Sequence, residues 1–271
     1  MLAKMTDRYR VILTARENSL PQLIETVSGV GIDHRLMDLS DPAQCERCML
    51  EILDDYGGVD ILVNNAGINY RSVVEHLQRD EEQQQMQTNF FAPLQLIRLV
   101  LPSMRGRHAG RIINVSSVGG MMAMPTMGIY SASKFALEGL SESLWYEMRP
   151  WGIHVSLVQP GFVRSDSYRK VLLSEAARQA IAEKGAYYNY YLHMDRFIAR
   201  LMDRAIISPE LVAEKITALM DAKSHPLRLP VGNDSHFFGW LRRLLPRGMY
   251  HRLLYAKLPG IDRWGTGRRD E

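Results

Sequence analysis

The sequence is poor in cysteine, in net charge and in long apolar runs, and each shortage excludes a class of protein. Its 271 residues include only two cysteines, Cys45 and Cys48, whereas a zinc site built on cysteine pairs needs a second pair. The net charge of +3 is too small to indicate a nucleic-acid partner. No apolar run approaches the roughly 20 residues of a membrane-spanning helix. We therefore expect two unpaired helix cysteines, no metal site, no nucleic-acid binding and no membrane-spanning segment.

The first residues also lack the long apolar core that marks a signal peptide. The composition, 46% hydrophobic and 23% charged, is ordinary for a globular chain of this length. We therefore expect a cytoplasmic protein, with membrane association left open.

Short apolar, β-branched runs alternate along the chain with stretches of helical character. The runs predict strands over residues 9–15, 34–39, 60–64, 111–117, 153–161 and 227–232. Helices are predicted from Ser19, over 41–56, 81–104 and 130–149, within 166–207, and over 208–223. This alternation is typical of parallel βαβ units, so we expect an α/β fold: a doubly wound, mostly parallel, Rossmann-like sheet with helices on both faces. Ligands bind such sheets beyond the carboxyl ends of the strands.

No internal repeat or low-complexity linker interrupts this pattern, so we expect one domain over residues 1–234 and a C-terminal appendage over residues 235–271. The appendage mixes Phe, Trp and Leu with arginines, and from Arg242 onward it holds eight Arg or Lys against three acids. A basic amphipathic stretch can lie on a membrane surface. It can equally pack on the domain or on a partner subunit, and the sequence leaves these alternatives open.

Two side chains of the segment YSASK have acid–base potential. Tyr130 and Lys134 stand four residues apart at a predicted helix start, so they share one face of the helix. A tyrosine has an ordinary pKa of about 10, and a neighbouring ammonium group favours its phenolate form. The pair alone is a weak signal, because this spacing also arises by chance.

Three further features fall near this pair at the predicted sheet edge. Ser117 ends the preceding strand, where its hydroxyl can bond a substrate oxygen or merely begin a turn. Gly67 in NNAG allows close approach of the backbone to a ligand, or serves an ordinary turn. Pro93 lies four residues after Asn89 and has no N–H, so the Asn89 carbonyl loses its helical donor and the helix should kink. The freed carbonyl can hold a water, or the kink can simply fit the packing.

Together these features resemble the short-chain dehydrogenase/reductase family, over about Tyr9 to Gly232. The matching pieces are NNAG at Asn64, Asn89, Ser117, YSASK at Tyr130, and PGFVRS at Pro160. The resemblance implies an oxidoreductase in which Tyr130 is the general acid or base, while Lys134 lowers its pKa and binds the nicotinamide ribose. It also implies that Ser117 positions the substrate oxygen and that Asn89 holds a proton-relay water.

A set of cofactor contacts follows from the same resemblance. Besides the tyrosine and lysine of YSASK, the set comprises Arg16, Asp38, Asn64, Ala66, Gly67, Pro160, Gly161, Val163 and Ser165. Family members that prefer NAD commonly carry an acid where the strand at Tyr9 ends. Here Arg16 follows an uncharged residue, which suits a 2′-phosphate and favours NADP over NAD, unless this is only a solvated surface arginine. Asp38 resembles the family's aspartate near the adenine amino group, and Ser165 keeps the hydroxyl of the family's usual threonine.

One family element has no counterpart in the sequence. The family opens with a strand, a glycine-rich turn of the type T-G-x-x-x-G-x-G that holds the cofactor pyrophosphate, and a helix, whereas MLAKM resembles only the end of that helix. We expect roughly 25–30 residues of one βα unit to be absent. Six strands should then remain, with a gap of roughly 9–10 Å beside the strand at Tyr9 unless two strands re-pair. Three explanations of this absence remain open: the recorded start is late or the sequence is a fragment, the chain is an inactive remnant, or it is a stable binding protein. The intact catalytic residues favour the first explanation.

Two segments indicate the substrate class. The loop after Ser117 reads GGMMAMPTMG, and methionines adapt to irregular apolar shapes. The segment AYYNYY, which ends at Tyr191, falls where this family usually carries its variable substrate lid. We expect a small lipophilic substrate, a secondary alcohol or ketone of steroid, retinoid or fatty type, although these side chains can equally be core. The resemblance implies a homo-oligomer, and the competing hypothesis is a truncated, non-catalytic binding or membrane-surface protein.

Overall fold

The computed structural model describes residues 8–19, 21, 32–165, 171–223 and 225–265. Its strands are β1 (Ile12–Ala15), β2 (Asp33–Leu36), β3 (Ile61–Asn64), β4 (Gly110–Val115), β5 (Ile153–Pro160) and β6 (Arg228–Val231). Each overlaps a strand predicted from the sequence, and all the pairings between them are parallel. The helix expected from Ser19 falls mostly outside the described residues.

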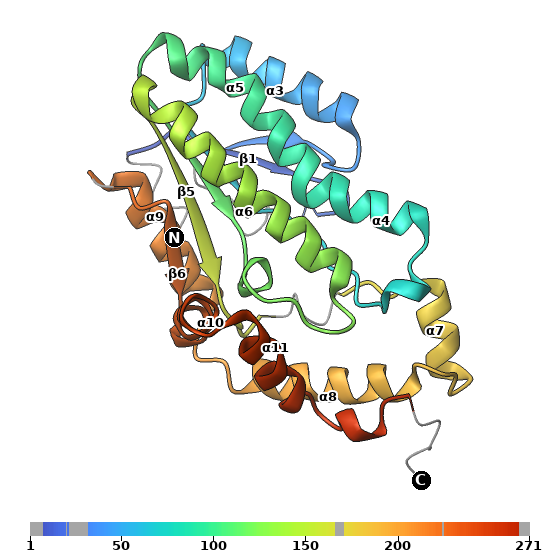
Figure 1. Ribbon diagram of the computed structural model, residues 1–271. Coiled ribbons are helices and arrows are strands. Elements are labelled where there is room, and N and C mark those ends of the chain that lie inside the picture. The colour runs from blue at the N-terminus through green and yellow to red at the C-terminus, as the bar shows by residue number, and fades with distance from the viewer. Residues whose placement is uncertain (1–7, 20, 22–31, 166–170, 224, 266–271) are drawn as a thin grey trace.

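The helices lie in layers against these strands. They are α3 (Pro42–Tyr56), α4 (Arg79–Met86), α5 (Ala92–Gly106), α6 (Gly128–Met148), α7 (Glu175–Ala182), α8 (Tyr188–Asp203), α9 (Pro209–Asp221), α10 (Asn233–Leu244) and α11 (Arg247–Ala256). Figure 1 shows α3, α5 and α6 together on one side of the strands, with α9 beyond β5 and β6 on the other side. The predicted α/β architecture with helices on both faces is confirmed.

The two faces of β4 show why the sequence folds into these layers. Ile112 belongs to a buried core with α3, α5 and α6, while the next residue, Ile113, belongs to a second core with α9. Successive side chains of a strand point to opposite faces, so a strand with unbroken apolar residues is buried on both sides. Cys45 and Cys48 are unpaired and buried on α3 within the first core, as predicted.

The six strands form two sheets, so a single six-stranded sheet is not confirmed. β1 pairs with β2, and the other four strands pair in the order β3-β4-β5-β6. Within the described residues, no backbone pairing joins β1 to β3. A strand must lie about 4.8 Å from its neighbour to form a ladder, whereas the start of β1 is held by α9, where Asp221 accepts hydrogen bonds from Arg8 and Tyr9. Of the two outcomes expected beside Tyr9, separation of the strands is the one seen.

The C-terminal appendage folds back on the domain. Ser235 on α10 donates its Oγ hydrogen to the Gln159 carbonyl at 2.8 Å, which seats this helix against β5. Beyond α11, Leu258 and Trp264 pack in a cluster with residues of α8. Among the helices in the described ranges, none is long and apolar enough to cross a bilayer.

Candidate active site

The first turns of α6 place the tyrosine and the lysine of YSASK at the carboxyl end of β4. Lys134 is only 5% exposed; its Nζ donates to the Val115 carbonyl at 2.9 Å and lies 6.0 Å from the centre of the Tyr130 ring. A side-chain hydrogen bond links Tyr130 to Ser117, whose Oγ also accepts from the Gly119 amide at 3.0 Å. A β-carbon at Gly119 would stand 2.8 Å from Cε1 of the tyrosine ring, so glycine is needed here. The structure therefore brings three predicted residues into one cluster.

Burial acts on both titrating groups of this cluster. It raises the pKa of the Tyr130 hydroxyl, and the hydrogen bond with Ser117 opposes that shift. It lowers the pKa of the Lys134 ammonium to about 8, against the opposing effect of the Glu138 carboxylate one helical turn away. Lys134 is not among the groups that shift the tyrosine, so the lowering that the family resemblance implies stays a prediction. At neutral pH the cluster holds a protonated tyrosine beside a charged lysine, which is the state that a proton donor requires.

Asn89 lies in a π-helical segment, Gln87–Phe91, between α4 and α5. Because Pro93 has no N–H, the ordinary helical ladder cannot run through this region, and the Ala92 amide bonds the Gln87 carbonyl five residues back. The single helix predicted over 81–104 is therefore three consecutive helical pieces. Such π-bulges are frequent at functional sites.

The Asn89 side chain ties the loop after β3 to α6. It is 1% exposed, and its Oδ1 accepts from the Ile68 amide at 2.9 Å. Its Nδ2 donates to the Ile68 carbonyl at 3.0 Å and to Ser133 Oγ at 3.1 Å. Ser133 in turn donates to the Tyr130 carbonyl at 2.7 Å. Asn89 thus helps to position the tyrosine, while its proton-relay role stays a prediction.

The loop after β3 leaves a cradle beside the lysine. A β-carbon at Gly67 would lie 3.2 Å from Asn89 Oδ1 and 3.7 Å from Lys134 Nζ, so the bare backbone borders both groups. Ala66 and Gly67 are exposed, whereas Asn64 is buried and donates to Asn114 Oδ1 at 2.8 Å. The family resemblance assigns these residues to cofactor binding, and the structure places Gly67 next to Lys134 of the Tyr130 cluster.

The end of β5 and the loop after it carry four predicted cofactor contacts: Pro160 is the last residue of the strand, and Gly161, Val163 and Ser165 follow it. The Phe162 amide donates to Asp234 Oδ2 at 2.5 Å, and the Arg164 amide donates to the Ile207 carbonyl at 2.8 Å. These bonds fix the path of the loop over the carboxyl end of β5, the strand that pairs with β4.

Arg16 and Asp38 lie just past the strands of the two-stranded sheet. Arg16 follows β1 and is exposed, and Asp38 follows β2. The Asp38 carboxylate accepts from the amide and the hydroxyl of Ser40, at 2.9 and 2.7 Å. Both residues stand past the carboxyl ends of their strands, as predicted, but no contact within the described structure joins them to the Tyr130 cluster.

The methionine loop forms an apolar wall beside the tyrosine. Met124, Met127 and Tyr130 pack in one cluster with Met194 and Ile198 of α8, which are each 1% exposed. These methionines are therefore part of the packed core and also lie beside Tyr130, so both interpretations of the loop, core and adaptable substrate wall, stay possible for the same side chains. The side of the cluster toward α8 is apolar.

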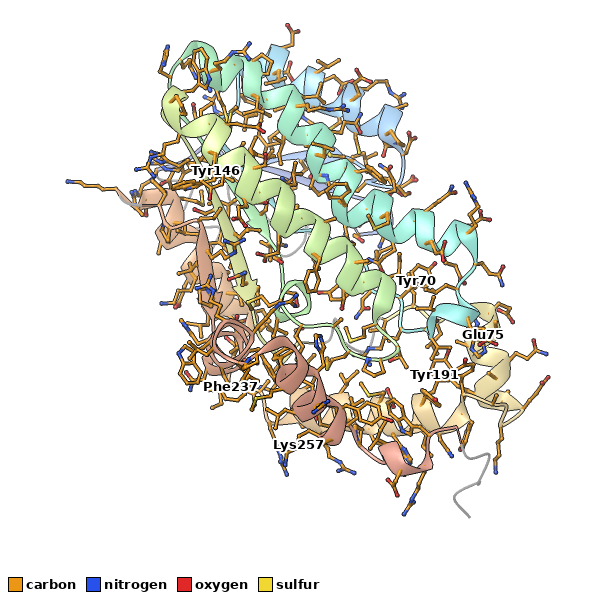
Figure 2. All side chains as sticks on the ribbon, viewed as in Figure 1. Tyr70, Glu75, Tyr146, Tyr191, Phe237 and Lys257 are labelled. Atoms are coloured by element: carbon orange, nitrogen blue, oxygen red, sulfur yellow. The ribbon has the colours of Figure 1, made fainter. Side chains whose placement is uncertain are left out.

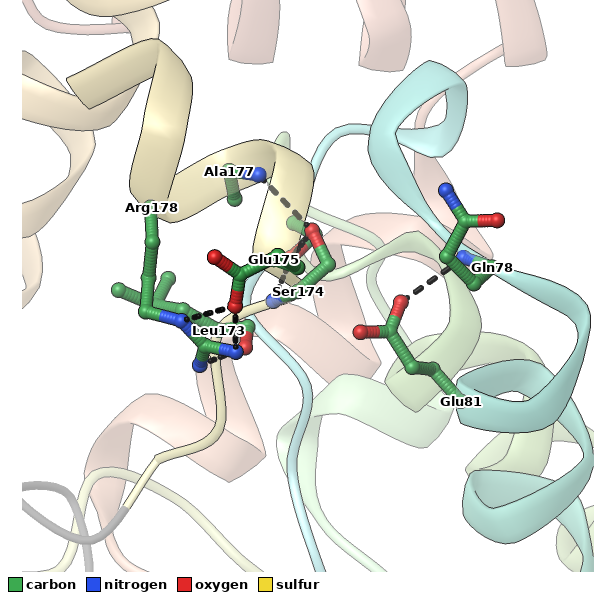
Figure 3. A network of polar contacts seen from close by, with 8 residues as sticks. Gln78, Glu81, Leu173, Ser174, Glu175, Ala177 and Arg178 are labelled. Carbon is green, nitrogen blue, oxygen red and sulfur yellow. Dashed lines mark hydrogen bonds and ion pairs between the residues drawn. The ribbon is translucent and has the colours of Figure 1, made fainter. Parts of the chain in front are cut away.

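The helices α7 and α8 are tied to the loop between β3 and α4. Ser174, at the start of α7, accepts from the Ala177 amide at 3.1 Å and bonds Ser72 Oγ at 3.0 Å. Figure 3 shows this cap close to the start of α4, where the Gln78 amide donates to Glu81 at 2.8 Å. The start of α7, which precedes the segment that the resemblance assigns to a lid, is thus anchored to the loop after β3.

Tyr191 provides a second anchor, on α8. Its hydroxyl accepts from the Val73 amide at 3.1 Å and lies 2.9 Å from His76 Nδ1. Figure 2 shows Tyr191 and Glu75 near one another at the end of the molecule that also holds α7. The tyrosine-rich segment is therefore fixed to the loop between β3 and α4 by specific polar contacts.

Sequence reasoning missed four residues that support the site. They are Asn114, Ser133, Glu138 and Asp234. Signals existed for three of them: Asn114 is a polar residue flanked by Ile113 and Val115 in its strand, Glu138 stands one helical turn after Lys134, and Asp234 follows the last strand. The bond of Ser133 to Asn89 had no such signal, because it joins segments far apart in the sequence.

The chemistry of the cluster suits the nicotinamide side of a dinucleotide. An open backbone at Gly67, a buried cation at Lys134 and hydroxyls at Ser117 and Tyr130 surround it, and the buried Ser116 Oγ has no partner in the described structure. In the described ranges, no group of three or more His, Cys, Asp or Glu side chains could hold a metal ion. The residues of this cluster therefore fit the nicotinamide end of a dinucleotide cofactor.

Comparison with known proteins agrees with this chemistry. A family model described as short chain dehydrogenase matches residues 2–176. The 3-ketodihydrosphingosine reductase of Bacteroides thetaiotaomicron is 34% identical over 197 residues, which cover 73% of this chain and 71% of the relative. Retinol dehydrogenase 8 of Bos taurus is 34% identical over 230 residues, or 82% of this chain and 72% of the relative.

A solved structure of a metagenomic short-chain oxidoreductase in complex with NADP resembles this fold. The match has a TM-score of 0.63 and 25% sequence identity, and it covers 85% of this chain and 87% of the other. The matched family model and the extent of the two relatives show that this chain belongs to the short-chain dehydrogenase family of oxidoreductases.

Proposed function

We propose that this protein is an NADP-dependent oxidoreductase acting on a lipophilic secondary alcohol or ketone. The observation that carries the proposal is the cluster at the start of α6. There Tyr130, Lys134 and Ser117 bring a proton donor, a cation and a second hydroxyl together beside an apolar wall. This combination suits proton transfer to an oxygen of an otherwise apolar molecule.

In the direction of ketone reduction, Tyr130 donates its hydroxyl proton to the substrate oxygen. NADPH, when bound, supplies the hydride that reduces the carbonyl carbon, so one hydride and one proton convert the ketone to the alcohol. Ser117 orients the oxygen through its hydroxyl, and the Lys134 ammonium stabilises the tyrosinate that remains. In alcohol oxidation the same groups act in reverse, with Tyr130 as the base.

Asn89 serves the return of the proton to Tyr130. Its carbonyl lacks the helical donor that Pro93 cannot supply, and its side chain borders the same cradle as Lys134 Nζ. A water held between that carbonyl and the lysine would pass a proton from solvent toward the tyrosine.

The choice of NADP rests on Arg16. This exposed guanidinium, just past the carboxyl end of β1, suits a 2′-phosphate, and a structural relative was solved with NADP bound. Asp38 would stand near the adenine, and Gly67 with Lys134 would border the nicotinamide ribose. The loop from Pro160 to Ser165 would cover the nicotinamide.

A lipophilic substrate follows from the wall and from the relatives. Met124, Met127 and Met194 make the α8 side of the cluster apolar and adaptable. The two relatives are named for retinol and for 3-ketodihydrosphingosine, which are both lipophilic molecules. We propose the same class for this protein, of steroid, retinoid or fatty type.

A second candidate function is a non-catalytic binding protein. The observation that favours it is the separation of β1 and β2 from the other four strands, because Arg16 and the Tyr130 cluster then lie on sheets that no described pairing joins. Titration with NADPH, followed by nicotinamide fluorescence, separates the two functions. Saturable binding supports the oxidoreductase, and the absence of binding supports the second candidate.

Turnover tests the proposal directly. With a panel of lipophilic ketones, the protein should oxidise NADPH, and Tyr130→Phe should lower kcat by at least about 100-fold while NADPH binding persists. Tyr146→Phe, at an exposed tyrosine farther along the same helix, is the matched control and should retain full activity. If Tyr130→Phe turns over at the rate of the control, the acid–base assignment is refuted.

A further inference from the structure

α10 and α11 carry an unusual concentration of exposed apolar side chains. Of fifteen large apolar side chains that are more than a third exposed among the described residues, six lie on these helices of 12 and 10 residues. The six are Phe237, Trp240, Leu244, Met249, Leu253 and Tyr255. Single exposed apolar residues are normal, whereas a contiguous group marks an interaction surface.

Most of these side chains follow helical spacing. On α10, Phe237, Trp240 and Leu244 recur after three and four residues, which places them along one stripe of the helix. On α11, Met249 and Leu253 stand four apart and share a face in the same way. Trp240 and Leu244 are 62% and 58% exposed, so the stripe on α10 is turned toward solvent.

Other side chains already seat these helices on the domain. Leu241 and Tyr250 are 8% and 4% exposed. The Arg242 guanidinium lies 4.8 Å from the centre of the Phe135 ring and donates to the Met121 carbonyl. These contacts hold the two helices in place, while the side chains of the stripes remain more than a third exposed.

The charge of α10 and α11 is predominantly positive, with Asp234 in the first turn of α10 as the one acid. Residues 235–258 contain five Arg or Lys and no Asp or Glu. Arg243, Arg252 and Lys257 are exposed, and none of them forms an ion pair with another described residue. Each cation near an anionic lipid surface raises the affinity by about fivefold. Apolar stripes flanked by unpaired cations match the chemistry of such a surface.

We propose that α10 and α11 dock on the surface of an anionic lipid bilayer. The docking face consists of Phe237, Trp240, Leu244, Met249 and Leu253, with Arg243, Arg252 and Lys257 contacting lipid headgroups. The apolar side chains enter the boundary between headgroups and acyl chains, where the Trp240 ring is also favoured.

A second copy of the chain fits this face less well. A two-fold interface would place the cations of one copy against those of the other, which is unfavourable without acids between them. Of the acids near these helices, Glu138 and Glu142 are engaged with Arg228 at 3.2 and 2.6 Å. Asp234 accepts from a backbone amide of the loop after β5, and Asp262 is a single exposed acid past α11. Charge complementarity therefore favours a bilayer as the occupant.

The residues that follow α11 connect the docking face with the proposed active site. Past α11, Leu258 and Trp264 pack in the same cluster as Met127 and Tyr130. Trp264 Nε1 also donates to His193 Nδ1 of α8 at 3.1 Å. A lipophilic substrate dissolved in the bilayer would thus meet the apolar wall from the docked side, a step that rests on the proposed function, whereas the docking itself does not.

Co-sedimentation with vesicles tests the docking, using the whole chain without cofactor or substrate. The protein should bind vesicles that contain phosphatidylglycerol, bind pure phosphatidylcholine vesicles far less, and be released by salt. Combined Arg243→Glu, Arg252→Glu and Lys257→Glu should weaken binding by roughly 100-fold. Combined Trp240→Ser and Leu244→Ser should weaken it by at least about tenfold.

Tyr146→Ser is the matched control, since Tyr146 is 61% exposed and lies far from Lys257 at the other end of the molecule (Figure 2). It should bind like the unmodified chain. Equal binding to both vesicle types, or an equal loss in the control, overturns the proposal. A change of mass in light scattering for the Trp240→Ser, Leu244→Ser variant, with no vesicle binding by the unmodified chain, assigns the face to a second copy instead.

Fluorescence quenching guards against misfolded variants. Brominated lipids should quench tryptophan emission of the unmodified chain, and much of that quenching should disappear in Trp240→Phe, which keeps an aromatic ring in place. Quenching that is the same in both proteins contradicts the docking of α10. Since no cofactor is present, failure here leaves the oxidoreductase proposal intact, and absence of turnover leaves the docking proposal intact.

Discussion

Under the proposed function, the four-stranded and the two-stranded sheet serve opposite ends of the cofactor, and the two regions differ in burial and in charge. Beside the four-stranded sheet, the helical residues Asn89 and Lys134 are 1% and 5% exposed and are held by hydrogen bonds to the backbone. On the two-stranded sheet, Arg16 is exposed and Asp38 is bonded to nearby Ser40. The catalytic end is thus fixed by burial and the adenosine end by solvated charge. Substitutions in the first region should change chemistry and folding, and those in the second should change cofactor choice alone.

Replacement of the buried lysine should give the largest effect. Lys134→Met should lower kcat/KM by roughly 100- to 1000-fold, because the cation that stabilises the tyrosinate is lost. Arg16→Met, next to the two-stranded sheet, should lower kcat/KM by about tenfold at most, and only when NADPH is the cofactor. Both values come from initial rates of NADPH oxidation, and similar losses in the two variants would contradict the division between the sheets.

The same lysine should give stability a characteristic pH dependence. Its pKa is about 8 in the folded protein against an ordinary value of 10.5, so the folded state binds fewer protons than the unfolded state between these values. The free energy of unfolding should therefore rise from pH 8 to pH 10 in the unmodified protein. This rise should be absent in Lys134→Met, and urea denaturation at each pH measures it. An identical pH dependence in both proteins would show that the lysine is not desolvated.

Loss of the buried asparagine should act on stability. Asn89→Ala removes the partner of the Ile68 amide, whereas the Ile68 carbonyl keeps its bond from Gln85 Nε2, and should lower the free energy of unfolding by about 1–3 kcal/mol. Asp38→Ala, which frees only the exposed Ser40, should cost about 1 kcal/mol or less. Chemical denaturation of the two variants checks the contrast, and equal losses would mean that burial does not distinguish the two regions.

Reversal of the exposed arginine should act on specificity. Arg16→Asp should raise the KM for NADPH by about tenfold and leave kcat and the melting temperature unchanged, because this exposed side chain is proposed to act on the 2′-phosphate. The ratio of kcat/KM for NADPH and NADH measures this shift. An unchanged ratio would leave Arg16 as a solvated surface residue.

The smallest expected effect concerns the acid behind the lysine. Glu138 opposes the lowering of the Lys134 pKa, so Glu138→Gln should shift the decline of ketone reduction to lower pH. Glu142→Gln is a matched control, since Glu142 bonds the same Arg228 but does not act on the lysine. The pH profile of kcat/KM should move in the first variant only, and a shift in both would point to Arg228 instead.

The sequence was sufficient where the determinants are local. The helix start at YSASK, the strand before Ser117 and the proline after Asn89 are short-range features, and the structure gathers Tyr130, Lys134 and Ser117 as expected. It was insufficient where distant segments meet. The bond of Asn89 to Ser133 and that of Asp234 to the loop after β5 depend on the packed fold. The separation of the two sheets likewise depends on which strand edges come close enough to pair.

The central claim is that the Tyr130 cluster directs hydride and proton transfer between NADPH and a lipophilic ketone. Deuterium transfer tests it most directly: the chain is incubated with NADPH deuterated at either face of C4 and with a lipophilic ketone, and the alcohol is analysed by mass spectrometry. The account predicts an alcohol that carries deuterium from one labelled form only, and no such alcohol from Tyr130→Phe. Unlabelled alcohol from both forms, or equal labelling by the Tyr130→Phe variant, would contradict it.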